Sequence, residues 1–211
     1  MAIPVALVAF IIDDSGSMKS LAPATCAAFN AYVDVLKKTK GAEIRFSAYP
    51  LESATPYQSD VPVQDALTLT DGTDGGGNYR PFRSSTPLFM TVRDVIDKLE
   101  ETLKRVGPRK VVVCIQTDGV DPTDVTSTKR RIQEKQCEGW EFVFMGTHDK
   151  SSTQQVARSL GIPHANYMFY SSNQRATLAA FSAAGWNVGA YTSGRAANAG
   201  FTEEQQRQAK G

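Results

Sequence analysis

The sequence predicts an α/β fold in which a doubly wound, mostly parallel sheet carries helices on both of its faces. Two short, continuous aliphatic runs, Val5–Ile12 and Val111–Ile115, are typical of strands that are buried on both sides. Around them, strand-like runs alternate with segments whose apolar residues recur every three or four positions, the spacing of one helix face. This succession of strand, helix and strand indicates right-handed crossovers within one sheet.

The N-terminal half provides the first strands and one helix. After the strand at Val5–Ile12, a helix is expected to end before Gly41, and its apolar stripe consists of Ala22, Cys26, Phe29, Val33 and Leu36. The run Glu43–Tyr49 alternates less cleanly and is interpreted as the next strand. Residues 50–85 contain several prolines and a glycine-rich run, so we expect an irregular recognition surface there, with one weak strand near Ala66–Leu69.

The C-terminal half repeats the alternation. Thr86 and Pro87 favour a helix start, and Gly107 with Pro108 is expected to stop that helix after the stripe Leu88, Val92, Val95, Leu99 and Leu103. The further elements are a strand at 111–115, a polar helix at 123–136, a strand at 141–145, a short helix at 153–160 and a strand at 165–168. The stripe of a final helix consists of Leu178, Phe181, Ala184, Val188 and Tyr191. We expect one domain over residues 1–195 and a surface-lying or frayed tail over residues 196–211.

Composition excludes several classes of partner. The chain has 211 residues, of which 41% are apolar and 21% charged, as in an ordinary globular domain. With 23 basic and 22 acidic residues there is no long-range field to attract nucleic acid or an anionic membrane. Three cysteines indicate no disulfide framework, and Cys114, Trp140 and Trp186 are expected in the core. Without a signal peptide or a transmembrane run, we expect a cytoplasmic protein, or a virion-associated one if a phage encodes it.

Oxygen-bearing side chains follow both central strands. Asp13, Ser15 and Ser17 come directly after the first run, and Asp118 follows the second, while Thr86 stands before the second helix. In a doubly wound sheet, the loops after neighbouring central strands meet at one crevice, so these residues are expected to lie together. Hydroxyl and carboxylate oxygens without a nearby His or Cys favour Mg²⁺, with Mn²⁺ as a close substitute.

The same spacing leaves part of the coordination shell open. Asp13, Ser15 and Ser17 alternate along an extended segment and can point the same way, with Gly16 permitting the turn. Two hydroxyls and two carboxylates do not fill an octahedron, and Mg²⁺ usually keeps water. A carboxylate from outside can take the open position, so the pattern indicates a metal that binds a partner's Asp or Glu.

Each piece also has a simpler interpretation. Asp-x-Ser-x-Ser alone is typical of a capped turn, Thr86-Pro87 of a helix start, and Thr-Asp-Gly of a loop. The coincidence of all three at expected element ends favours the metal site. Around it, we predict that Tyr79, Arg80 and Arg83 select the partner, and that Asp121 and His148 stand at its rim unless they are ordinary loop residues.

The three segments together resemble the metal-ion-dependent adhesion site of von Willebrand factor type A (vWA) domains, which have a Rossmann-like sheet. The resemblance implies that Ser15, Ser17 and, in one state, Thr86 contact the metal directly, that Asp13 and Asp118 act largely through water, and that a partner protein donates an acidic side chain. The chain is also similar to small stand-alone bacterial and bacteriophage members, through Gly139–Phe142 and Phe201–Glu204.

Three classes of function remain open at this stage. The first is a metal-dependent adhesion or adaptor module, and the second is a structural or accessory component of a larger assembly such as a bacteriophage virion. The third is a metal-dependent phosphohydrolase or a nucleotide-dependent enzyme. The loop after the first strand contains neither Gly-x-Gly-x-x-Gly nor Gly-Lys-Ser/Thr, and no base oriented by a third group is evident, so we do not predict an enzyme.

Overall fold

A computed structural model describes residues 4–51, 55–82, 87–107, 109–119, 121–147 and 149–210. Within these ranges the strands form one sheet of order β3-β2-β1-β4-β5-β6, in which β3 is antiparallel to β2 and the other neighbours are parallel. The strands are β1 (Val5–Ile12), β2 (Glu43–Pro50), β3 (Gln58–Pro62), β4 (Lys110–Thr117), β5 (Glu141–Gly146) and β6 (Tyr167–Phe169). The fully buried aliphatic strands β1 and β4 lie in the middle, as their sequence predicts.

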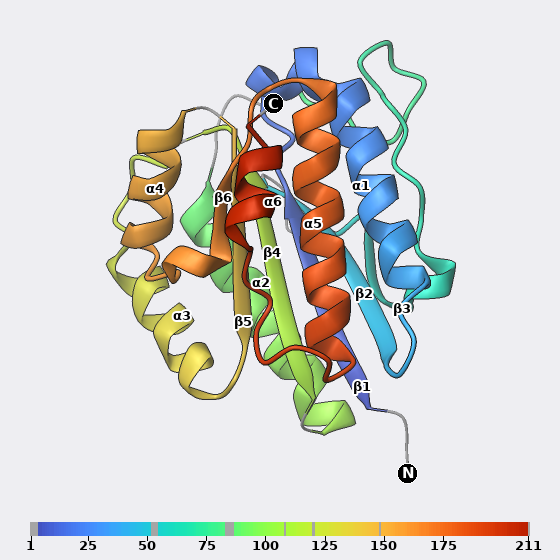
Figure 1. The fold of residues 1–211 in the computed structure, drawn as a ribbon, viewed down its shortest axis with the longest axis vertical. Coiled ribbons are helices and arrows are strands. Elements are labelled where there is room, and N and C mark those ends of the chain that lie inside the picture. Colours follow the sequence, from blue (N-terminus) through green and yellow to red (C-terminus); the bar gives the residue numbers. More distant parts are fainter. Residues whose placement is uncertain are drawn as a thin grey trace.

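Helices cover both faces of the sheet (Figure 1). One face carries α1 (Ala22–Lys37), α5 (Gln174–Thr192) and α6 (Glu203–Gln208), and the other carries α2 (Leu88–Val106), α3 (Thr126–Cys137) and α4 (Lys150–Ser159). Short 3-10 turns occupy Gly16–Leu21, Val63–Asp65 and His164–Asn166. The predicted doubly wound α/β fold is therefore confirmed. Within the described ranges, no helix combines the length and the apolar character needed to span a bilayer.

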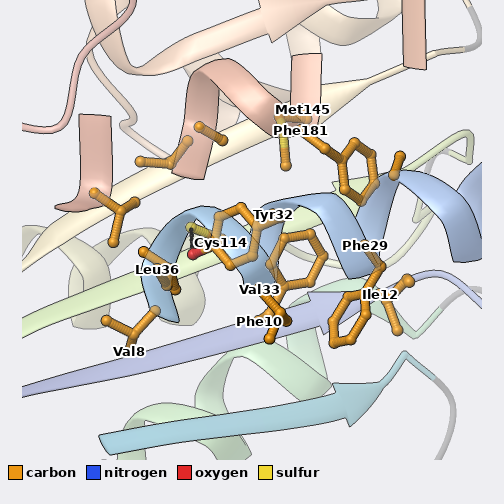
Figure 2. Close-up of a cluster of buried hydrophobic side chains, with 14 of the residues drawn as sticks. Val8, Phe10, Ile12, Phe29, Tyr32, Val33, Leu36, Cys114, Met145 and Phe181 are labelled. Carbon is orange, nitrogen blue, oxygen red and sulfur yellow. Dashed lines mark hydrogen bonds between the residues drawn. The ribbon is translucent and has the colours of Figure 1, made fainter. Parts of the chain in front are cut away.

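Successive residues of β1 serve the two opposite cores. Phe10 packs toward α1 and α5, with its ring centroid 5.4 Å from that of Phe29, 4.9 Å from Tyr32 and 5.5 Å from Phe181 (Figure 2). The Tyr32 hydroxyl lies 3.3 Å from the sulfur of Cys114, which is fully buried as expected. Residues on the alternate positions of β1 pack under α2, α3 and α4. Apolar cores therefore pack against both faces of the sheet at β1 and β4.

The predicted strand at Ala66–Leu69 is wrong. That segment is held to α1 instead, because the side chain of Asn30 accepts a hydrogen bond from the Leu69 amide at 2.9 Å and donates to the Leu69 carbonyl at 2.9 Å. The edge strand is β3, whose polar sequence carries no periodic signal. Its Asp60 pairs with Arg45 of β2, with 2.6 Å between Nε and Oδ1, so an ion pair across the strands accompanies the backbone pairing.

Two further expectations need correction. Trp186 and Leu178 are 59% and 43% exposed on α5, so neither is a core residue, whereas Trp140 is buried. The segment after residue 195 lies on the surface but is not frayed, because it contains α6 and buries Ala199, Phe201 and Ala209. The division at residue 195 stays a prediction.

Candidate metal site

The site lies where the strand order reverses, between β1 and β4. These strands run parallel with Ile12 opposite Gln116, so both chains leave the sheet at the same level. The Asp13 amide then donates to the Gln116 carbonyl at 3.1 Å and to the Gln116 side-chain oxygen at 3.2 Å. Parallel register therefore brings Asp13 and the 117–118 segment together from opposite halves of the chain.

Hydrogen bonds hold the carboxylate of Asp13 in one orientation. The side chain is fully buried. Its Oδ1 accepts from the Ser15 amide at 2.8 Å, and its Oδ2 accepts from the Thr117 hydroxyl and from the Asp118 amide, the latter at 3.3 Å. One carboxylate thus links the loop after β1 to the loop after β4. Its bond with the Ser15 amide is also the capped turn of the simpler interpretation.

The two serine hydroxyls take no part in that turn. Ser15 precedes the 3-10 turn at Gly16–Leu21 with an extended backbone, and its side chain makes no capping hydrogen bond. Its Oγ lies 3.0 Å from Oγ of Ser17, and the Ser17 hydroxyl donates to Oδ1 of Asp118 at 2.9 Å. Ser15 is buried, Asp118 is partly buried and Ser17 is exposed. The result is a row of three oxygen atoms, which we call the oxygen row, whose middle member, Ser17, is exposed at the surface.

The oxygen row fits a small divalent cation. Mg²⁺ holds oxygen ligands at about 2.0–2.1 Å, so neighbouring ligands of its octahedron stand about 2.9 Å apart. The two contacts of the oxygen row measure 3.0 and 2.9 Å. That separation also suits a hydrogen bond, but a hydroxyl hydrogen can rotate away and leave a lone pair for a metal. Among the described residues no group of three or more His, Cys, Asp or Glu side chains gathers, so the donor chemistry is that of hydroxyls with carboxylates.

Neither a protein-family profile nor a curated protein matches this sequence. Solved structures do. Proximal thread matrix protein 1 from the mussel byssus superposes with a TM-score of 0.57 at 15% identity, over 90% of this chain and 46% of that one. Manganese-loaded TRAP protein of Plasmodium vivax gives 0.57 at 16% identity, over 85% and 74%. The vWF domain of the type V pili tip protein Mfa5 from Porphyromonas gingivalis gives 0.53 at 10% identity, over 90% and 95%.

The chain has a von Willebrand factor type A fold. It spans about half the length of the mussel protein but nearly the whole of the Mfa5 vWF domain, so the similarity corresponds to one vWA domain. In this fold the oxygen row lies at the edge of the sheet where β1 and β4 end.

A layer of buried polar side chains lies beneath the oxygen row. Gln116 joins the Asp13 amide to the hydroxyl of Tyr170, to which its Nε2 donates at 3.1 Å. On the other side, the Tyr79 hydroxyl donates to the Asp13 carbonyl. Burial, and then the charge of Asp13, raise the pKa of Tyr79; burial likewise raises the pKa of Tyr170. Both phenols therefore stay protonated at neutral pH.

Sequence reasoning missed this layer. The signal for Gln116 is a polar residue placed directly before Thr117 at the end of an otherwise apolar strand. Tyr79 was predicted to contact a partner, and this interpretation is wrong for the described structure, because the side chain is fully buried against Asp13. No sequence pattern indicates that Tyr79 reaches back across 66 positions.

The other predicted residues divide into three groups. Asp13, Ser15, Ser17 and Asp118 lie together as described, whereas Thr86, Arg83 and His148 fall outside the described residues. Arg80 is exposed, and its guanidinium donates to the carbonyls of Gly77 and Gly75 at 3.0 and 3.2 Å, so it braces the glycine-rich loop.

Asp121 is buried instead of standing exposed at the rim. Its Oδ2 accepts from the Phe89 amide at 2.9 Å, and its Oδ1 accepts from the Thr123 amide at 2.9 Å. The first amides of a helix have no acceptor within the helix, and the Asp121 carboxylate supplies one for the Phe89 amide in the first turn of α2. Asp121 therefore positions the helix that begins after Pro87.

Proposed function

We propose that this vWA domain is a metal-dependent protein-binding module, in which a divalent cation held at the oxygen row captures an Asp or Glu side chain of a partner protein. The observation that carries the proposal is the contact of Ser15 Oγ, Ser17 Oγ and Asp118 Oδ1 at 3.0 and 2.9 Å on the switch point of the sheet. Thr86 is proposed as a further ligand on the strength of its place in the sequence motif.

The charges around the oxygen row support a cation. Asp13 and Asp118 belong to the two loops that the oxygen row joins, and Asp13 is fully buried. The Asp118 amide donates to the Asp13 carboxylate at 3.3 Å, so the two acidic residues are neighbours, and like charges repel most strongly where water is excluded. A divalent cation bound beside them would relieve this repulsion. Oxygen-only donors favour Mg²⁺, with Mn²⁺ a close substitute, and the manganese-loaded TRAP protein is a similar fold that holds such an ion.

The hydrogen bonds of Asp13 support an open coordination position. Its two oxygens already accept three donors, so we propose that Asp13 faces the ion through water, and that the direct ligands are mainly the hydroxyls of Ser15 and Ser17. Neutral ligands leave the ion with excess positive charge. A carboxylate from a partner neutralises it, which makes binding specific for acidic residues.

A binding role is favoured over catalysis. The similar vWF domain belongs to Mfa5, which is a protein of the pili tip, and this supports a role in adhesion. The loop after β1 contains neither Gly-x-Gly-x-x-Gly nor Gly-Lys-Ser/Thr, so a nucleotide-dependent reaction is not proposed. Within the adhesion class, the partner is proposed to be a protein, free or part of a larger particle, and membranes and nucleic acid are not proposed as partners.

Capture of a partner from a source extract tests the proposal, with immobilised protein in Mg²⁺ and in EDTA. The Ser15→Ala, Ser17→Ala double variant should lose Mg²⁺-dependent capture. A matched double variant, Ser151→Ala with Ser172→Ala, removes two exposed hydroxyls elsewhere and should capture as the wild type does.

The captured protein then permits the decisive step. Conversion of one of its acidic residues to the amide should abolish retention at the same Mg²⁺ concentration. Capture that persists in EDTA and in the Ser15→Ala, Ser17→Ala variant would show that the interface lies elsewhere and would reject the proposal.

A further inference from the structure

A second cavity lies at the outer edge of the sheet, beside the last strand. It has a volume of about 350 Å³ and is bounded by α4, by β6 with the turn before it, and by α6 with Lys210 beyond its end. This volume is at the lower end of the range for small-molecule pockets, about 300–1,000 Å³. None of its lining residues belongs to the oxygen row or to the polar layer beneath it.

Positive charge dominates the walls of this cavity. Lys150 comes from α4, and Arg207 and Lys210 come from the C-terminal segment, against the single carboxylate of Glu203. Arg207 forms an ion pair with Glu204, next to the cavity. Within the described residues, neither Lys150 nor Lys210 forms an ion pair. Two ammonium groups from opposite walls are therefore available to an anion.

The floor of the cavity adds an aromatic surface and a polar group. Tyr167 and Phe169 of β6 line it, and the His164 ring stands 5.0 Å from the ring of Tyr167, edge to face. Tyr167 is only 4% exposed, yet its hydroxyl has no hydrogen-bond partner among the described residues. Buried hydroxyl groups almost always have a partner, so this one is an exception that a bound acceptor would explain.

We propose that this cavity binds a small organic anion, a phosphate or carboxylate carried on an aromatic or similarly flat body. The ammonium groups of Lys150 and Lys210 bind the anionic group, the rings of Tyr167 and Phe169 contact the body, and the Tyr167 hydroxyl donates to an acceptor of the ligand. Because α6 forms one wall, the ligand also fastens the C-terminal segment to the sheet. The site is independent of the metal site and of its partner.

Calorimetric titration with three simple probes tests this site. Phenyl phosphate and benzoate carry the two candidate anions on the same ring, and phenol is the neutral reference. At least one anion should bind about tenfold or more tightly than phenol, because charge-assisted hydrogen bonds replace neutral contacts. The tighter of the two anions identifies the natural anionic group.

Two variants locate the binding. Lys150→Ala with Lys210→Ala should weaken the anion about tenfold or more, whereas Lys38→Ala with Lys40→Ala, which removes the same charge from an exposed segment elsewhere, should leave it unchanged. Tyr167→Phe should lower the affinity several-fold while the unliganded protein melts at or above the wild-type temperature, because the hydroxyl has no partner to lose.

Three outcomes would overturn the assignment. They are binding of phenol as tight as that of both anions, equal anion binding by the two double-lysine variants, and no saturable binding of either anion below about 10 mM, which is a weak but measurable affinity. Failure of this site would leave the proposed metal-dependent capture untouched, since the two sites share no residue.

Discussion

The loop that begins at Asp13 is fastened to the 70–82 segment by the hydroxyl of Tyr79, and Tyr79→Phe removes this hydrogen bond alone. The aromatic ring stays, so no cavity forms, but the fully buried Asp13 carbonyl loses its donor. An unsatisfied buried group of this kind costs about 1–3 kcal/mol. For a domain of about 200 residues, each kcal/mol corresponds to about 2–4 °C in melting temperature. We therefore expect Tyr79→Phe to melt about 2–12 °C below the wild type.

Tyr167→Phe is the matched control, because it makes the same chemical change at a buried phenol whose hydroxyl has no partner in the described structure. It should melt at or above the wild-type temperature. Calorimetry and urea unfolding at neutral pH measure both variants. The raised pKa of Tyr79 means that its contribution is present below the unfolded pKa of about 10 and is lost as the pH rises above it. Equal destabilisation by the two variants would refute the assigned role of Tyr79.

Three further predictions concern residues outside the oxygen row. Asp121→Ala should destabilise the domain by about 0.5–2 kcal/mol, measured by urea unfolding, because the Phe89 amide at the start of α2 loses its acceptor; an unchanged midpoint would contradict this. The hydrogen bond from Arg131 is the main cause that lowers the pKa of Glu100, so its stabilisation is present above the unfolded pKa and is lost as the pH falls through the lowered value. In Glu100→Gln the free energy of unfolding should therefore fall less between about pH 5 and pH 3 than in the wild type. The same pH dependence in both proteins would contradict this prediction. Trp186→Gln should change the free energy of unfolding by less than about 0.5 kcal/mol, since the side chain is 59% exposed; a larger loss would mean that it packs.

The central part of the fold was predictable because its physical signal is local. Strands buried on both faces are continuously apolar, and so are β1 and the Val111–Ile115 run of β4. The helices α1 and α2 also follow from their apolar stripes. Given a parallel sheet, the meeting of Asp13 with Asp118 required only the rule that loops converge where the strand order reverses.

The remaining features depend on contacts that are distant in sequence. The edge strand β3 is polar, and its Asp60 forms an ion pair with Arg45. A hydrophobic periodicity in the sequence cannot predict such a pairing. Exposure of Trp186 depends on which side of α5 meets α1 and the sheet, and an almost uncharged helix gives little indication of that side. The same limit applies to Tyr79 and Asp121, whose partners are known only once the chain is folded.

Binding of Mn²⁺, followed through the paramagnetic resonance of the free ion, tests the central claim most directly. The wild type should bind one ion per chain, Mg²⁺ should displace it, and saturation at about 100 times the dissociation constant should add about 2.7 kcal/mol of stability. The Ser15→Ala, Ser17→Ala variant should lose at least about tenfold in affinity, while Ser151→Ala with Ser172→Ala binds normally. Equal Mn²⁺ binding by both double variants, or none by the wild type, would contradict a metal at the oxygen row.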